Sequence, residues 1–162
     1  MIIAVVGGSR PQPDALTQAE AVGRELAQRG HTVICGGLGG VMEAACRGAR
    51  EAGGHTIGVL PGADPNDANQ HVEIPIVTNM GYARNVVIVL TAAAVIAVDG
   101  SYGTLSEIAI ALNHGKPVVG LGTWRISHPD DDTDSGDEEH IARAAGAAQA
   151  VEMAVSAAGA AS

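Results

Sequence analysis

The sequence predicts an α/β fold in three layers, with an open parallel sheet and helices on both of its faces. Short apolar runs alternate along the chain with longer amphipathic stretches, as strands and helices do in parallel α/β proteins. Glycines cluster directly after three of these apolar runs, where strands turn into helices. The chain has 162 residues, of which 46% are hydrophobic and 17% charged. These values predict one compact, Rossmann-like domain over residues 1–162.

The apolar runs and the stretches between them define the expected elements. Strands are predicted at residues 2–6, 32–35, 56–60, 73–77, 94–98 and 118–121. Helices are predicted at residues 13–29, 41–52, 82–90 and 104–114, and an Ala-rich helix at about 138–158. Pro13 opens the first helix and Gly30 closes it, while Gly53 and Gly54 close the second.

Composition excludes several classes of protein. The sequence has no Phe, and its aromatic residues are Tyr82, Tyr102 and Trp124, so Ala, Val, Ile and Leu must form the core. No window of eighteen apolar residues occurs and the N-terminus lacks a basic region, so we expect neither a membrane span nor a signal peptide. Two cysteines, Cys35 and Cys46, are too few for a disulfide framework or a zinc site. We therefore expect a cytoplasmic protein with reduced thiols and no metal site.

The net charge of −9 is concentrated in one segment. Seven acidic residues fall within residues 130–139, and the rest of the chain carries a net charge of only −2. An acidic chain is a poor match for proteins that bind nucleic acids through phosphate contacts. We expect an acidic, solvated loop at about 127–139 and no nucleic-acid partner.

The glycine clusters predict a ligand site. They follow the strands at 2–6, 32–35 and 94–98, and the carboxyl ends of parallel strands share one edge of the sheet. Each cluster leads into a helix whose N-terminal amides favour an anion, so we expect a phosphorylated ligand. Candidate ligand contacts are Gly8, Ser9, Gly37, Gly39, Gly40, Gly100, Ser101, Gly103 and Thr104. Thr104 is also predicted as the N-cap of its helix, and the P-loop pattern and the complete dinucleotide fingerprint are both absent.

One motif resembles a known family. Residues 99–107 read D-G-S-Y-G-T-L-S-E and resemble the P-G-G-x-G-T-x-x-E signature of the LOG-like superfamily, whose members were formerly described as possible lysine decarboxylases. The pair Arg84 and Asn85, and the stretch A-L-N-H-G-K-P-V-V at 111–119, are most similar to the molybdenum cofactor carrier protein-like branch. The likeness covers residues 1–122.

The resemblance implies two functions. In the hydrolase branch, Arg84 and Glu107 would be catalytic and would release free base and ribose 5-phosphate from nucleoside 5′-monophosphates. In the carrier branch, the same pocket would hold the molybdenum cofactor without cleaving it. Asp99, Ser101 and Asn85 depart from the hydrolase pattern, which favours the carrier.

Several questions stay open at the level of sequence. Glu43 either complements the start of its helix or contacts the ligand, and Asp99 binds either a ribose or a turn amide. A subunit that presents a nucleotide-sensing surface to partners is a third possible function. Relatives of this kind pair through helices, so we expect a homodimer or a higher homo-oligomer.

Overall fold

The structure is a computed structural model that describes residues 1–126 and 140–160. Within these residues, seven parallel strands form one open sheet in the order β4-β3-β2-β1-β5-β6-β7. The strands are β1 (Ile2–Gly7), β2 (Thr32–Cys35), β3 (Thr56–Leu60), β4 (Ile74–Val77), β5 (Ala94–Val98), β6 (Val118–Leu121) and β7 (Ala142–Arg143). The predicted Rossmann-like class is confirmed.

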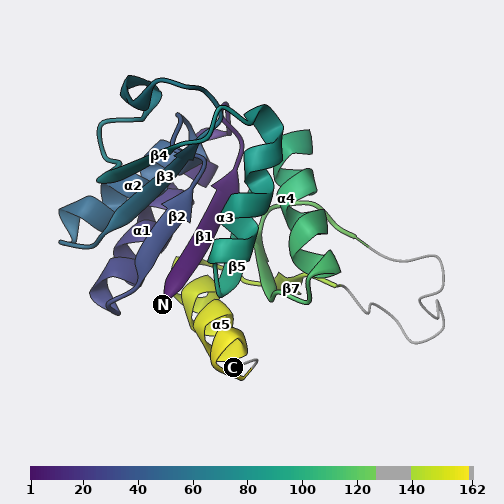
Figure 1. Cartoon of the computed structure of the whole chain (residues 1–162). Coiled ribbons are helices and arrows are strands. Elements are labelled where there is room, and N and C mark those ends of the chain that lie inside the picture. The colour runs from purple at the N-terminus through teal and green to yellow at the C-terminus, as the bar shows by residue number, and fades with distance from the viewer. Residues whose placement is uncertain (127–139, 161–162) are drawn as a thin grey trace.

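Helices cover both faces of the sheet (Figure 1). One face packs against α1 (Pro13–Gln28), α2 (Val41–Glu51) and α5 (Ala147–Ala160). The other face packs against α3 (Asn85–Thr91) and α4 (Tyr102–Asn113). Two short 3₁₀ helices, η1 (Pro65–Asp67) and η2 (Gly81–Arg84), lie in the connections around β4.

Alternating side chains of the strands build a core on each face. In β1, Ile3 and Val5 face the α1, α2 and α5 layer, whereas Ala4 and Val6 face α3 and α4. Both sides are made almost entirely of small and aliphatic residues, as the absence of Phe predicts.

Glycines allow α1 and α2 to approach each other closely. A Cβ on Gly23 would lie 1.9 Å from the carbonyl oxygen of Ala45, and a Cβ on Gly48 would lie 1.9 Å from that of Glu20. Arg47 closes the same contact through an ion pair of 2.5 Å with Glu20. These two helices and the strands between them therefore form a firm base for the loops at the carboxyl edge.

The end of the chain departs from the prediction. The Ala-rich helix begins at Ala147 rather than near residue 138, and the unpredicted strand β7 precedes it. Pairing with β6 explains the difference, because Ala142 and Arg143 align with Val119 and Gly120 and compete with local helix propensity. The acidic loop predicted at about 127–139 lies outside the described residues.

Two other helices start elsewhere than predicted. The helix expected at 82–90 is a 3₁₀ turn over Gly81–Arg84 followed by α3. The helix expected from Thr104 begins at Tyr102, with Ser101 as the N-cap. In the described part of the chain, no helix is both long enough and apolar enough to cross a membrane.

Candidate functional site

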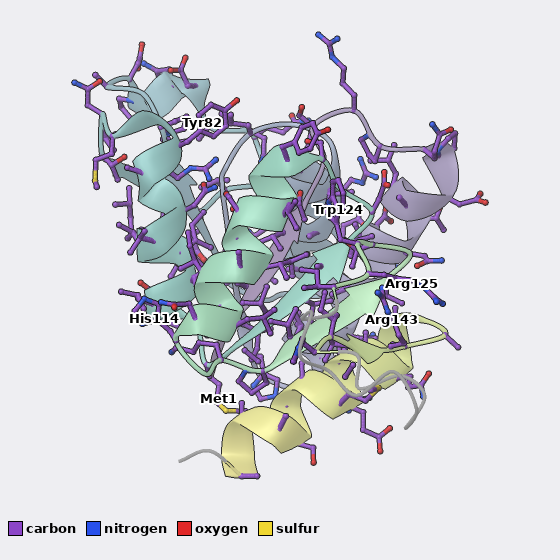
Figure 2. The ribbon with its side chains drawn as sticks, turned by 90° about the vertical axis from the view of Figure 1, so that its right-hand side faces the viewer. Met1, Tyr82, His114, Trp124, Arg125 and Arg143 are labelled. Carbon is purple, nitrogen blue, oxygen red and sulfur yellow. The ribbon has the colours of Figure 1, made fainter. Side chains whose placement is uncertain are left out.

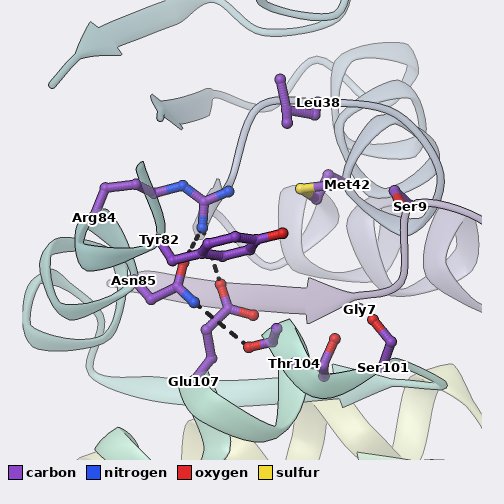
Figure 3. A pocket seen from close by; sticks show the side chains of 11 residues that line it. Gly7, Ser9, Leu38, Met42, Tyr82, Arg84, Asn85, Ser101, Thr104 and Glu107 are labelled. Atoms are coloured by element: carbon purple, nitrogen blue, oxygen red, sulfur yellow. Dashed lines mark hydrogen bonds and ion pairs between the residues drawn. The ribbon is translucent and has the colours of Figure 1, made fainter. Parts of the chain in front are cut away.

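The glycine loops meet at the carboxyl edge of the sheet, where they border a cavity of about 160 Å³ that we call the central pocket. Its lining comes from the ends of β1 and β2, from η2 and the start of α3, and from α4 (Figure 3). The lining residues are Gly7, Ser9, Leu38, Met42, Tyr82, Arg84, Asn85, Ser101, Gly103, Thr104 and Glu107. The structure thus brings together Ser9, Arg84, Asn85, Ser101, Gly103, Thr104 and Glu107 of the predicted site.

The N-terminus of α4 forms one wall of this pocket. Ser101 caps the helix in an extended conformation without a side-chain hydrogen bond, so its side chain leaves the first amides of α4 free for a ligand. Gly100 has φ of 115° and passes directly over Thr104, where a Cβ would lie 2.5 Å from the Cβ of Thr104. Thr104 is therefore not the N-cap that the sequence predicts, because the helix starts two residues earlier and buries this side chain beneath Gly100.

Arg84 and Asn85 form a buried network with α4. One guanidinium nitrogen of Arg84, Nη1, donates to Oδ1 of Asn85 and lies 3.5 Å from Oε1 of Glu107. Asn85 in turn donates through Nδ2 to Oγ of Ser106 at 2.8 Å, and Ser106 donates to the carbonyl of Gly103 at 2.7 Å. The network fixes the arginine relative to the helix N-terminus, and Figure 3 shows Arg84 and Glu107 projecting toward each other.

Burial changes the protonation of this pair. Glu107 is 6% exposed, and burial raises its pKa from the usual 4.5 to about 7 although the nearby Arg84 opposes the shift. Burial also lowers the pKa of Arg84, and its Nε has no hydrogen-bond partner within the described residues. Near neutral pH the carboxyl group is therefore divided between its neutral and charged forms.

Asp99 forms backbone hydrogen bonds in the turn just before the N-terminus of α4. Its φ of 50° is left-handed, its amide donates to the carbonyl of Leu121 at 3.0 Å, and its carbonyl accepts from Oγ1 of Thr123 at 2.5 Å. Proline has φ near −65° and no N–H, so it does not fit this conformation. The substitution of the signature proline thus goes together with a distinct turn in this chain.

Other predicted residues lie around the central pocket without lining it. Gly8 accepts the amide hydrogen of Val41, and Gly37 packs against Gly58 and Leu60 of β3. Gly39 lies near the carboxylate of Glu43. Gly40 and Glu43 line a second cavity of about 370 Å³ together with Arg10 and Arg47. Ser9 borders both cavities, so the two are neighbours.

Four lining residues were missing from the sequence-based site: Gly7, Leu38, Met42 and Tyr82. Gly7 directly precedes the predicted Gly8, at the end of β1. Leu38 and Met42 belong to the second glycine loop and the start of α2, and the spacing of the glycines already placed that loop at the edge. Tyr82 carried a different signal, because it is one of only three aromatic residues in the sequence, none of which is fully buried.

The loop after β6 contacts the N-terminus of α4 from outside the central pocket. Trp124 donates from Nε1 to the carbonyl of Ser101 at 3.2 Å, and its ring lies 5.7 Å from that of Tyr102. Arg143 of β7 donates to the carbonyls of Thr123 and Trp124 at 3.1 and 2.6 Å. Figure 2 shows Trp124 and Arg143 on the same side of the molecule. The unpredicted strand β7 therefore helps to fix the N-cap of α4.

Cys35 and Cys46 lie behind the second glycine loop. Both are free and buried, and their sulfur atoms are 3.5 Å apart. The amide of Gly37 donates to the Cys35 thiol at 3.3 Å. The hydrogen bond with the Cys35 thiol and, after it, burial raise the pKa of Cys46. Among residues 1–126 and 140–160, no group of His, Cys, Asp or Glu side chains is arranged to hold a metal ion.

Fold and site together define a Rossmann-like protein with a partly polar pocket at the carboxyl edge of its sheet, and comparison with known proteins gives the family. The SLOG cluster4 family model matches residues 1–155, so the chain belongs to that family. An uncharacterized protein of Archaeoglobus fulgidus is 46% identical over 75% of this chain and 80% of its own length. A cytokinin riboside 5′-monophosphate phosphoribohydrolase of Mycobacterium marinum is 34% identical over 75% of this chain and 71% of its own.

Solved structures extend the likeness over almost the whole chain. The molybdenum cofactor binding protein of Rippkaea orientalis has a TM-score of 0.84 at 36% identity and covers 96% of this chain and 95% of its own. The molybdenum cofactor carrier protein of Chlamydomonas reinhardtii has a TM-score of 0.80 at 36% identity, with 96% of both chains covered. The predicted resemblance to the LOG-like superfamily and to its carrier branch is confirmed.

Proposed function

We propose that this protein is a carrier that binds a phosphorylated pterin of the molybdenum cofactor type, with its phosphate on the N-terminus of α4. The buried network of Arg84, Asn85 and Glu107 is the observation that carries this proposal. Asn85 accepts from Arg84 and anchors it to Ser106, so the arginine is held in place as a fixed donor. The near-complete coverage of two molybdenum cofactor proteins supports the same ligand class.

The proposal gives each group a role. The free amides after Ser101, together with Gly100, Gly103 and Thr104, bind the phosphate oxygens. Arg84 supplies positive charge from the opposite wall, while a neutral Glu107 donates a hydrogen bond instead of repelling the phosphate. The part of the ligand beyond the phosphate lies beside the first two glycine loops, toward the second cavity. The residues concerned are Gly8, Ser9, Gly37, Gly39, Gly40 and Glu43. Such a site binds without needing a nucleophile.

A second candidate is a nucleoside 5′-monophosphate phosphoribohydrolase. It is favoured by the presence of Arg84 and Glu107 in one pocket, 3.5 Å apart, and by the phosphoribohydrolase relative. In this function Glu107 must be ionised, because a carboxylate stabilises positive charge on the sugar or activates water.

The two functions predict opposite pH dependence. Above pH 7 the phosphate is already a dianion, so the remaining change in the pocket is the ionisation of Glu107. Hydrolysis would become faster as the pH rises through about 7, whereas binding of the dianion by a carrier would become weaker. The pH profile therefore separates catalysis from carriage at the same residue.

The direct test uses two readouts on the same protein. Purified protein is incubated with each nucleoside 5′-monophosphate, and free base is measured by chromatography. In parallel, protein loaded with molybdenum cofactor is isolated, and the bound pterin is quantified by fluorescence after oxidation. The carrier predicts bound pterin near one per protein chain and no base release. Base release that disappears in Glu107→Gln would establish the hydrolase and refute the carrier.

We also propose that the carrier works in the cytoplasm as a homodimer. Val86 and Leu90, one turn apart on α3, are 39% and 45% exposed and form an apolar stripe on the helix. Burial of such a stripe against a second copy removes apolar surface from water. The free thiols of Cys35 and Cys46 suit a reducing compartment.

A further inference from the structure

The aromatic residues of this chain lie around the carboxyl edge of the sheet, and none of them is a fully buried core residue. The sequence has two Tyr, one Trp and no Phe, and none of the three is fully buried. Tyr82 lines the central pocket, Tyr102 follows the N-cap of α4, and Trp124 is bonded to that N-cap. Large aromatic side chains usually stabilise a fold through burial, so their position here needs another explanation.

Tyr102 and Trp124 have a structural explanation, but Tyr82 does not. Tyr102 lies against the indole of Trp124, which is partly buried on the core beside α4. Tyr82 is 83% exposed and belongs to neither face of the core. Its hydroxyl makes no hydrogen bond with the described residues. The fold therefore gains little from this side chain.

The position of Tyr82 is nevertheless well fixed. The backbone turn before it is closed by bonds from the amide of Asn79 to Gly62 and from the amide of Gly81 to Pro61, each 3.0 Å long. Two residues later, Arg84 is anchored in the pocket wall. A Cβ built on Gly103 would lie 4.0 Å from Cε1 of Tyr82, so the ring faces the first turn of α4. In Figure 3 the ring lies across the pocket between Arg84 and Thr104.

The size of the cavity requires a ligand to extend beyond it. At about 160 Å³ the central pocket is smaller than the roughly 300–1,000 Å³ of most small-molecule sites. A phosphate bound by the amides of α4 fills the inner part. The rest of the ligand must then lie at the mouth, where Tyr82 offers an exposed aromatic face.

We propose that Tyr82 stacks on the planar heterocycle of the phosphorylated ligand and determines its specificity for ring-bearing phosphates. This inference rests on the proposed function, because it assumes that the phosphate lies on α4. Stacking of a base on an aromatic side chain contributes enough to change affinity by tenfold or more. A phosphorylated sugar without an aromatic base would keep the phosphate contacts and lose this contribution.

Calorimetric titration with matched ligands tests the inference. The probes are ribose 5-phosphate, which has no planar aromatic heterocycle, GMP, and a pterin monophosphate. Guanine and pterin share the same 2-amino-4-oxopyrimidine ring, so GMP is a close and available substitute. In the unmodified protein we expect the better of the two ring-bearing probes to bind at least about tenfold tighter than ribose 5-phosphate.

Variants of Tyr82 assign the effect. In Tyr82→Ala the affinity of the better ring-bearing probe is expected to fall to within about twofold of that of ribose 5-phosphate, whose own affinity stays unchanged. Tyr82→Phe is expected to restore this ratio of affinities. Tyr102→Ala is the control, because it removes an equally exposed tyrosine (81%) that does not line the pocket. Tyr102 packs on Trp124 beside the N-cap of α4, so its loss is expected to change the affinity for all three probes alike. It should keep the ratio.

Each other outcome overturns the inference in a distinguishable way. If ribose 5-phosphate binds as tightly as the ring-bearing probes, the phosphate site stands and the stacking role of Tyr82 is refuted. If Tyr82→Ala keeps the ratio but changes the molar mass in light scattering, the ring is a contact between copies of the chain. If no probe binds, the proposed function fails and the stacking role fails with it.

Discussion

At the scale of single residues, Glu107 links the chemistry of the pocket to the stability of the protein. Glu107 is 6% exposed, and among the described residues Arg84 is the one that compensates its charge, at 3.5 Å. The folded-state pKa of about 7 lies above the ordinary 4.5, so the folded protein binds this proton more tightly than the unfolded chain does. The contribution of Glu107 to stability is therefore fully present below pH 4.5 and is lost as the pH rises to about 7.

Replacement by an uncharged isostere should reveal this contribution. Glu107→Gln is expected to equal the wild type in stability near pH 4.5 and to exceed it by about 2–3 kcal/mol at pH 8. Urea denaturation at both pH values measures the difference. Glu152→Gln, on the exposed side of α5, should follow the wild type throughout. Equal stability of Glu107→Gln and wild type at pH 8 would show that the charge of Glu107 does not destabilise the folded protein.

Asp99 offers a test of the turn that replaces the signature proline. Asp99→Pro should destabilise the protein by about 3 kcal/mol, since proline cannot adopt φ of 50° and loses the hydrogen bond to Leu121. Asp99→Asn keeps the bond and tolerates the conformation, so its stability should stay within about 0.5 kcal/mol of the wild type. Thermal unfolding compares the two variants. A stable Asp99→Pro protein would mean that the turn has a different conformation.

Much of the site was predictable at this scale, but not all of it. Arg84, Glu107 and the glycine loops stood out because their spacing matched a motif or followed a strand. Met42 belongs to a glycine loop that the sequence placed at the edge, but α2 decides that its side chain enters the pocket. Tyr82 has no such spacing, and it enters the pocket only because η2 directs it there. The raised pKa of Glu107 was equally hidden, because burial depends on neighbours distant in the sequence.

At the scale of elements, the N-terminus of α4 depends on the glycine before its cap. Both Gly100 and Gly115 have positive φ, 115° and 63°, and they flank the same helix. A Cβ on Gly100 would collide with Thr104, whereas a Cβ on Gly115 meets nothing within 4 Å. Both positions therefore require glycine for its backbone conformation, but only Gly100 also requires it because there is no space for a side chain.

Alanine at the two positions should have unequal effects. Gly115→Ala carries only the strain of a left-handed residue, about 1 kcal/mol. Gly100→Ala adds a collision in a packed site, for a total of about 3 kcal/mol, and should also weaken phosphate binding. Denaturation curves and a phosphate titration measure both effects. Equal destabilisation by the two variants would contradict the close contact between Gly100 and Thr104.

Elements were predictable where local pattern and tertiary structure agree. Strands β1 to β6 follow apolar runs bounded by glycine or loop residues, and their predicted limits are correct to within one residue. Strand β7 has only two residues in an Ala-rich context, and it exists because β6 offers an unpaired edge. Information of that kind is absent from any local window of sequence.

At the scale of the whole molecule, the exposed stripe on α3 predicts assembly. Light scattering should give twice the 16.2 kDa of one chain. The double variant Val86→Glu, Leu90→Glu should be monomeric, because two carboxylates would face an apolar partner surface. Ile74→Glu, at the sheet edge formed by β4, is the matched control and should stay dimeric. A monomeric wild type would refute the homodimer.

The most direct test of the central claim places a negative charge where the phosphate should lie. Gly103 has room for a side chain, since the nearest atom to its Cβ position is 4.0 Å away, so Gly103→Asp should fold normally. Gly146→Asp adds the same charge before α5, where nothing lies within 4 Å of the Cβ position. The measurement is a calorimetric titration of a pterin monophosphate into wild type and both variants, followed by chromatography of the mixture.

Wild type and Gly146→Asp are expected to bind equally, and the ligand is expected to be recovered intact. Gly103→Asp should bind at least about tenfold more weakly, because its carboxylate repels the phosphate and occupies the amides of α4. Binding by Gly103→Asp as tight as that of the wild type would contradict a phosphate site at the N-terminus of α4.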